Sequence, residues 1–211
     1  DFDKTYSRFR RDSLVWQISE KAGEYRFPED SRIFFDYYSR LYKITEGKFT
    51  LLIGNTLSQA GYDVSYSLKP GKINKVPAES EVFSFDYPVL KVKKPYILDF
   101  GGLGKGYLID IVSDLLKENG VDAFCIDAGG DIYCHNLQKS MRVGLENPLD
   151  SKQVIGVVSI NNKSICASSG NRRRWDKFHH IMDTLNCLPP SIEPTATGHI
   201  ICLLYTSDAA D

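Results

Sequence analysis

Apolar and aromatic residues recur every three or four positions along residues 29–43, and this spacing predicts a helix with one aromatic face. We expect the helix to start at Asp30 or Ser31, and we interpret its aromatic face as core packing. A second short element is predicted over residues 49–57.

Turn and strand signals follow these two elements. Residues 61–63 (Gly-Tyr-Asp) are a predicted turn, and residues 66–80, which contain prolines and a glycine, are predicted to form a loop or lid. Three later stretches have the pattern of strands and cover residues 140–145, 154–160 and 163–168.

The middle of the chain alternates between strand and helix patterns. Residues 89–99 become continuously apolar, as a strand entering a sheet does, and a glycine-rich segment follows at once. Residues 107–119 have a helical pattern that ends at a glycine, and residues 121–127 are the next predicted strand. We therefore expect a strand–helix–strand crossover and one mixed α/β domain over residues 1–201.

The charge balance narrows the possible partners. The 211 residues include 26 basic and 27 acidic side chains, so the formal net charge is −1. This balance produces no long-range field that would attract nucleic acid or an anionic membrane surface. Hydrophobic residues make up 42% of the chain, an ordinary globular proportion that argues against disorder over its whole length. No apolar run reaches the ~18 residues that a membrane span needs.

The cysteines do not predict a structural metal. None of the five has CxxC spacing, and four histidines do not complete a zinc signature with them. Cys125 and Cys166 lie in apolar, strand-like runs, so we expect both to be buried free thiols.

The first candidate site is the segment DFGGLGKGY, residues 99–107. Glycines between a strand and a helix let the backbone approach a ligand, and the N–H groups of a helix start favour an anion. The segment is neither a P-loop, since Lys105 is followed by glycine, nor a GxGxxG fingerprint. Asp99 and Lys105 would bring both signs of charge to one place. A tight connection without a ligand is the alternative.

The second candidate site is the segment DAGGD, residues 127–131, at the end of the next predicted strand. Two neighbouring strands would then both end in acid and glycine at the carboxyl edge of the sheet, where open α/β sheets bind ligands. Carboxylates gathered there suit a divalent cation that would neutralise a pyrophosphate. The alternative is that Asp131 caps a turn.

The third candidate site begins at residues 168–170 (Ser-Ser-Gly) and continues through three arginines and Trp175 to residues 179–183 (His-His-Ile-Met-Asp). A histidine beside an aspartate, after a basic and aromatic stretch, suits an acid/base group near a phosphate. The alternatives are a structural histidine and an arginine run on a solvated face.

Taken in order, the segments DFGGLGKGYLID, DAGGDIY, MRVGLENP, ICASSG and HHIMD resemble the ApbE family, the FAD:protein FMN transferases. SRFRRDS near the start, and TEGKF followed by AGYD, resemble further blocks of this family. The resemblance covers roughly residues 5–189, and seven blocks in register make it specific where one block would be weak. It implies a single mixed α/β domain built around a flavin-binding cleft.

The resemblance also implies roles for individual residues. Asp99 and Lys105 would contact FAD, and the carbonyl of Gly102 would be a magnesium ligand. His180 would be the general base for the incoming hydroxyl group. The remaining flavin and nucleotide contacts would be Phe9, Ala60, Gly61, Tyr62 and Ile181.

The reaction that the resemblance implies is transfer of the FMN moiety of FAD to a threonine hydroxyl of a target flavoprotein, with Mg²⁺ and release of AMP. The acceptors would be subunits of membrane redox complexes. The enzyme would be a lipoprotein on the extracytoplasmic face of a bacterial membrane. Two other functions remain open: a flavin- or FAD-binding module without catalysis, and a pyrophosphatase that converts FAD to FMN and AMP.

The chain departs from the family pattern near both ends. After Asp183 only Pro189 agrees with the pattern, and the family's C-terminal magnesium block, an Asp with a following Thr, has no match. The family's N-terminal methionine-containing flavin contact has no match either. We therefore expect an incomplete domain that transfers FMN far more slowly than a complete one. Residues 202–211 resemble a translated sequencing adapter and are expected to be foreign to the fold.

Overall fold

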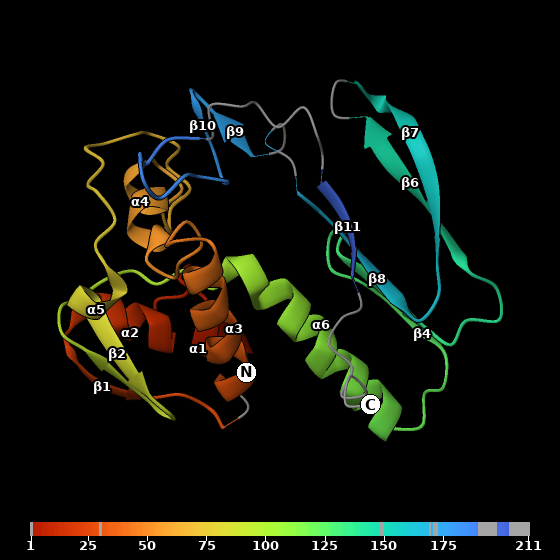
Figure 1. Cartoon of the computed structure of the whole chain (residues 1–211), viewed down its shortest axis with the longest axis horizontal. Coiled ribbons are helices and arrows are strands. Elements are labelled where there is room, and N and C mark those ends of the chain that lie inside the picture. The colour runs from red at the N-terminus through yellow and green to blue at the C-terminus, as the bar shows by residue number, and fades with distance from the viewer. Residues whose placement is uncertain are drawn as a thin grey trace. The chain divides into compact units, whose positions relative to one another are not determined.

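The structure, a computed structural model, describes residues 2–29, 31–147, 150–168, 170, 173–189 and the backbone of 198–202. Helices and strands both contribute, as the sequence predicts for a mixed fold (Figure 1). Contacts divide the chain into two compact units. The first contains residues 1–102 and 173–191, and the second contains residues 103–172 and 192–211. The predicted foreign segment lies outside the described residues except for the backbone of Cys202.

The first unit combines short helices with two small antiparallel sheets. The strand order is β1-β3-β2 in one sheet and β10-β9 in the other. The elements are α1 (Phe2–Tyr6), α2 (Leu14–Glu20), β1 (Gly23–Arg26), α3 (Ser31–Ile44), α4 (Ile53–Gln59), α5 (Glu79–Val82), β2 (Phe83–Asp86), β3 (Val89–Val92), β9 (Arg174–Trp175) and β10 (Phe178–His179).

Aromatic rings from distant segments form the core of the first unit around Phe100. The centroid of its ring lies 5.2 Å from that of Tyr6, 5.4 Å from that of Phe34 and 5.7 Å from that of Phe35. α3 supplies two of these rings, which confirms the predicted helix and its role in the core. The buried face of α3 contains Phe34, Phe35 and Tyr38, whereas Ile33 is 49% exposed.

The second unit packs a long helix against an antiparallel sheet. The sheet has the strand order β11-β8-β5-β4, and β6 pairs with β7 in a separate two-stranded sheet. Ile109 of the helix packs against Phe124 and Tyr133 of the sheet. The elements are α6 (Gly101–Glu118), β4 (Phe124–Asp127), β5 (Ile132–His135), β6 (Met141–Asn147), β7 (Asp150–Ile160), β8 (Lys163–Ser168) and β11 (Gly198–Cys202). The three predicted strands after residue 139 are thus confirmed.

The predicted crossover is wrong, because the two strands that it would join belong to different sheets. β3 ends at Val92, before a Lys-Lys-Pro segment, and a proline cannot donate a hydrogen bond to a ladder. β4 pairs antiparallel with β5 across the four residues 128–131. So short a connection suits a hairpin, whereas parallel strands need a long crossover. Asp99 and Asp127 therefore do not end neighbouring strands.

Helix α6 begins earlier than predicted, because the glycine segment forms its first turns. The carboxylate of Asp99 accepts a hydrogen bond of 2.7 Å from the Gly101 N–H, one of the groups that a helix start leaves without an intrahelical partner. A Cβ on Gly102 would lie 2.6 Å from the Phe49 ring, so close packing explains the glycine there. Every helix in the described part of the chain, α6 included, lacks the length and apolar character of a membrane span.

The prediction of buried thiols is wrong for Cys125, which is exposed, and Cys166 is only half-buried. Cys125 lies on β4, the edge strand of its sheet, where one side is open to solvent. Cys134 lies on the interior strand β5 and is fully buried.

Candidate functional site

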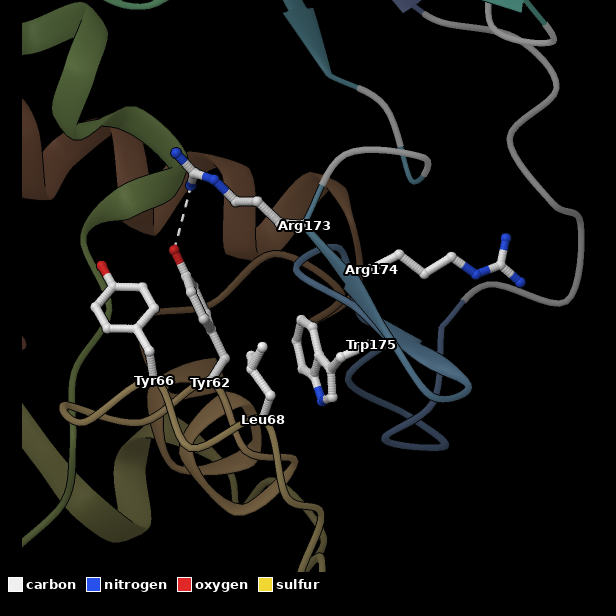
Figure 2. Close-up of a pocket in the computed structure, with 6 residues that line it drawn as sticks. All are labelled: Tyr62, Tyr66, Leu68, Arg173, Arg174 and Trp175. Carbon is white, nitrogen blue, oxygen red and sulfur yellow. Dashed lines mark hydrogen bonds between the residues drawn. The ribbon is translucent and has the colours of Figure 1, made fainter.

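A small cavity in the first unit is lined by aromatic and basic side chains (Figure 2). Its volume is about 210 Å³. One wall comes from the loop after α4 and the other from β9 and the residue before it. The lining residues are Tyr62, Tyr66, Leu68, Arg173, Arg174 and Trp175.

The loop that supplies the first wall depends on Gly61. This residue has φ +104°, and a Cβ there would lie 2.5 Å from the backbone nitrogen of Lys69. The Gly61 carbonyl accepts a hydrogen bond of 2.8 Å from the Leu68 N–H, which closes the loop. Tyr66 and Leu68 both have left-handed backbones, with φ of 50° and 53°. The predicted turn is thus confirmed as the base of a closed loop.

The carboxylate of Asp63 holds this loop from inside. It accepts hydrogen bonds from the backbone N–H groups of Ser65 and Ser67 at 2.8 and 3.1 Å, and from the Ser67 hydroxyl at 2.5 Å. The Ser67 hydroxyl stabilises the charged carboxylate and lowers the pKa of Asp63. The loop therefore has a local hydrogen-bond network that fixes Tyr66.

Further aromatic contacts support the residues that line the cavity. Phe9 stacks on Tyr66 with centroids 5.1 Å apart and an interplanar angle of 14°, and meets Tyr62 edge-on at 5.3 Å. The indole N–H of Trp175 donates a hydrogen bond of 2.7 Å to the carbonyl of Ala60. Ala60 is fully buried, so it supports Trp175 instead of lining the cavity with its own side chain. Phe9 and Tyr62, two of the expected flavin contacts, are thus brought together.

Arg8 connects this aromatic group to Asp99. Its Nε donates to Asp99 Oδ2 at 2.6 Å, and its Nη1 donates to the Tyr62 carbonyl at 2.7 Å. The guanidinium also lies over the Phe9 ring, 4.1 Å from its centroid. The side chains of Arg8 and Asp99 are 4% and 14% exposed, so the ion pair is largely shielded from water. One guanidinium therefore positions three of the residues expected to contact FAD.

Tyr62 presents its hydroxyl to a second cation. The Nη1 of Arg173 donates a hydrogen bond of 3.2 Å to this hydroxyl, as Figure 2 shows, while Arg174 points away from the tyrosine rings. Burial raises the pKa of Tyr62, and the positive charges of Arg173 and Arg8 oppose that shift. Tyr62 is therefore a neutral phenol whose own hydrogen can be donated to a ligand oxygen.

His180 directly follows β10, in the same compact unit as the cavity. Its neighbour His179 is 6% exposed, and the Nδ1 of His179 accepts a hydrogen bond of 3.2 Å from the Ile181 N–H. This contact requires a His179 ring that is unprotonated at Nδ1. His179 is thus a structural residue that fixes the backbone of Ile181, and the acid/base role remains a prediction for His180.

Lys105 belongs to the second unit. Its ion-pair partner differs from Arg8, the partner of Asp99. Lys105 forms an ion pair with Asp131 of the β4–β5 loop, and Asp131 is 8% exposed. Asp127 accepts a hydrogen bond of 2.8 Å from the Gly130 N–H within the same loop. The carboxylate of Asp127 therefore caps this turn, whereas that of Asp131 pairs with a cationic side chain. Asp99 and Lys105 each form an ion pair within their own unit, and their joint contact with FAD stays a prediction.

Several residues of the site were not expected from the sequence. Arg8 lies in the SRFRRDS segment, but nothing in that pattern distinguishes it from Arg10, which is exposed and pairs with Asp12. Tyr66 lies in the predicted loop, where no pattern distinguishes it, whereas Trp175 belongs to the third candidate site. A contact between this run and Tyr62 joins segments 111 positions apart, which no local pattern contains.

The chain matches the family model of the ApbE family over residues 1–198. An FAD:protein FMN transferase of Buchnera aphidicola subsp. Schizaphis graminum is 24% identical over 209 residues, covering 89% of this chain and 61% of the relative. One of Klebsiella pneumoniae is 33% identical over 97 residues, covering 44% and 30%. The chain thus spans at most about three fifths of these curated relatives.

Solved structures share the fold. The crystal structure of the ApbE protein of Thermotoga maritima has a TM-score of 0.74 at 20% identity, covering 89% of this chain and 66% of that one. The flavin transferase ApbE of Vibrio cholerae has a TM-score of 0.72 at 19% identity, covering 89% and 65%. A short stretch of 29 residues, 13% of the chain, is 72% identical to a cysteine–tRNA ligase of Opitutus terrae and covers 6% of that protein.

Proposed function

Because the chain belongs to the ApbE family, we propose that it transfers the FMN half of FAD to a threonine hydroxyl of another protein and releases AMP. The observation that carries this proposal is the aromatic cavity together with Arg8, which connects Asp99 to Tyr62, one of the residues that line the cavity. Flat aromatic walls suit the planar ring system of a flavin. A volume of about 210 Å³ is below the range of sites that enclose a whole drug-sized ligand, so it suits the flavin ring alone.

The proposed step is a substitution at phosphorus. The threonine oxygen bonds to the phosphorus on the FMN side, the bond from that phosphorus to the bridging oxygen breaks, and AMP leaves with the bridging oxygen. The hydroxyl proton passes to His180 as the general base. The position of His180 supports this role, because Phe178 beside it packs with Tyr62 and Trp175 in one apolar cluster of the cavity's own unit.

Magnesium dependence is a separate part of the proposal. A magnesium ion takes about six ligands in octahedral geometry, and the Gly102 carbonyl would supply one. No group of three or more His, Cys, Asp or Glu side chains gathers among the described residues. Asp99 and Asp131 are each paired with a basic side chain. These residues alone therefore do not fit a complete magnesium site.

We also propose, from the family, that the acceptors are subunits of membrane redox complexes and that the protein works as an extracytoplasmic lipoprotein. The two other candidate functions use the same cavity. In a pyrophosphatase, water would attack the phosphorus in place of threonine and give FMN and AMP. A binding module would retain FAD unchanged.

The test incubates the purified chain with FAD, Mg²⁺ and a flavin-free acceptor protein that contains threonine, and mass spectrometry records the acceptor's mass. We expect a slow gain of one FMN unit, because the described residues alone do not complete a magnesium site. We expect no gain when the threonine is replaced by alanine or when EDTA removes the metal. His180→Ala should slow transfer by about 10²–10⁴-fold, the usual contribution of a positioned general base. His135→Ala, on β5 of the second unit, is the matched control and should keep the rate.

Each remaining outcome decides between the candidates. FMN and AMP without an adduct would replace transfer by hydrolysis. Bound FAD that is recovered unchanged would identify a binding module. Failure to bind FAD at all would overturn the flavin assignment of the cavity.

A further inference from the structure

Three sulfur atoms meet in the second compact unit. The Sγ of Cys125 lies 3.1 Å from the Sγ of Cys134. The Sδ of Met141 lies 3.4 Å from the first and 3.6 Å from the second. The three residues come from β4, β5 and β6, so the fold brings together three separate strands to make this contact. We call these side chains the sulfur triad.

The register of the β4–β5 hairpin places the two thiols on one face. Cys125 and Cys134 are directly opposite each other. The Ala128 N–H donates to the Asp131 carbonyl at 2.9 Å, and hydrogen-bonded and non-hydrogen-bonded pairs alternate from that point. Cys125 and Cys134 therefore form a non-hydrogen-bonded pair, in which side chains approach most closely.

The sulfur triad is open on one side and closed on the other. Cys134 is fully buried among Ile132, Ile160 and Ile165. Cys125 is exposed and Met141 is 38% exposed. A small ion can therefore arrive from solvent at two of the sulfur atoms, while the third is held rigidly by the core.

We propose that Cys125, Cys134 and Met141 form a binding site for one soft monovalent metal ion, for which copper(I) is the appropriate probe. Thiolate and thioether sulfurs are ligands that select copper(I), whereas magnesium and calcium take oxygen. Binding displaces the thiol protons to water, and the thioether of Met141 binds without losing a proton.

The sulfur separations are close to those that a three-coordinate ion needs. With a metal–sulfur bond of about 2.3 Å, a planar site places its sulfur atoms about 4.0 Å apart. The observed separations of 3.1, 3.4 and 3.6 Å must each open by less than ~1 Å. Met141 can supply much of this movement, because its side chain is unbranched and partly exposed.

Protons compete with the metal at this site. Burial raises the pKa of Cys134 to about 12, and its hydrogen bond with Cys125 adds to the shift. Copper(I) binding releases protons from the cysteine ligands, so the affinity should rise with pH.

The same two cysteines could instead form a disulfide by losing two electrons and two protons to an oxidant. That reaction leaves no role for Met141, whose sulfur contacts both thiols. The thioether is therefore the observation that favours a metal ion, and it supplies the decisive variant.

The experiment titrates the full 211-residue chain, reduced and under anaerobic conditions, with copper(I) held by a competing chromophoric chelator. We expect uptake of one equivalent. Met141→Leu keeps the size of the side chain and should weaken binding by about tenfold or more, since even groups that only support a metal's ligands contribute 10–100-fold. Cys125→Ser should abolish uptake. Both side chains are partly exposed, so these variants retain the core.

Cys187→Ser is the matched control. Cys187 belongs to the first unit, and its thiol contacts the carbonyl oxygens of Asn74 and Thr184, which a serine hydroxyl can also reach. This variant should bind copper(I) as the unchanged chain does. Equal affinity of Met141→Leu or of Cys125→Ser would overturn the sulfur triad as the site. So would a reduced chain that takes up no copper(I) but loses two hydrogens in air, which would identify a disulfide.

Discussion

At the scale of single residues, Arg8 connects more parts of the candidate site than any residue that the sequence predicted. Its guanidinium satisfies Asp99, the Tyr62 carbonyl and the face of Phe9 at once. Arginine suits this place because its planar fork makes several hydrogen bonds in one fixed geometry. The sequence shows three arginines between positions 8 and 11, and only burial distinguishes the one that matters.

Breaking the Arg8–Asp99 pair from one side should cost more stability than replacing both partners. Arg8→Met leaves a shielded carboxylate without its cation and should lower the free energy of unfolding by about 3–5 kcal/mol. Adding Asp99→Leu should recover part of that loss, giving a coupling energy of about 1 kcal/mol or more. Urea unfolding of the four proteins measures the cycle.

The exposed pair Arg10–Asp12 offers the control for this cycle. Its side chains are 43% and 59% exposed, so Arg10→Met should lower the free energy of unfolding much less than Arg8→Met does. If Arg8→Met and Arg10→Met lowered the free energy of unfolding equally, the buried pair would contribute no more stability than the exposed one.

At the scale of elements, helix α6 places two acidic side chains one turn apart. Asp110 and Asp114 are separated by four residues, and Lys117 pairs with Asp114 at 3.6 Å. Burial raises the pKa of Asp110 to about 7, the charge of Asp114 adds to the shift, and Lys117 opposes it. The folded chain therefore keeps Asp110 protonated at pH values where an unfolded chain has lost the proton.

This helix should make stability depend on pH in a defined direction. The folded state binds the proton more tightly, so the stabilisation is complete below about pH 4 and is lost as the pH rises toward 7. An asparagine at position 110 cannot titrate, so Asp110→Asn should remove the contribution of this residue to the pH dependence. We expect the free energy of unfolding to vary with pH by about 1–2 kcal/mol less in the variant, a figure that allows for solvent screening of a half-exposed group. Urea unfolding of both proteins at pH 4.5 and 7.5 measures the difference. Parallel curves for the two proteins would contradict the assignment.

At the scale of the whole molecule, local patterns predicted segments but not their partners. α3 and the strands β6, β7 and β8 follow from the spacing of apolar positions. The pairing of β3 with β1 and of β4 with β5 depends on contacts that such spacing does not contain. The resemblance to the family, in contrast, implied that Phe9, Tyr62 and Asp99 contact one ligand, and in the structure Arg8 contacts all three.

Binding of FAD should stabilise the whole chain by mass action. At a concentration about 100 times its Kd, FAD should raise the free energy of unfolding by about 2.7 kcal/mol, and FMN at the same concentration should raise it less. Thermal unfolding with each flavin tests this. Tyr66→Ala removes the ring that stacks on Phe9 and should reduce the FAD effect, whereas Tyr87→Ala, an exposed ring outside the cavity, should not. Equal stabilisation by FAD and FMN would contradict a site that uses both halves of the dinucleotide.

The left-handed backbones of Tyr66 and Leu68 set two opposing requirements at these positions. A non-glycine residue in this conformation costs about 1 kcal/mol or more, and glycine would relieve the cost. Both side chains are also about half exposed, so the core gains little from them. Backbone strain alone would therefore favour glycine at both positions. The chain has a tyrosine and a leucine there, and both side chains line the cavity, so this loop gives up some stability in exchange for a cavity wall.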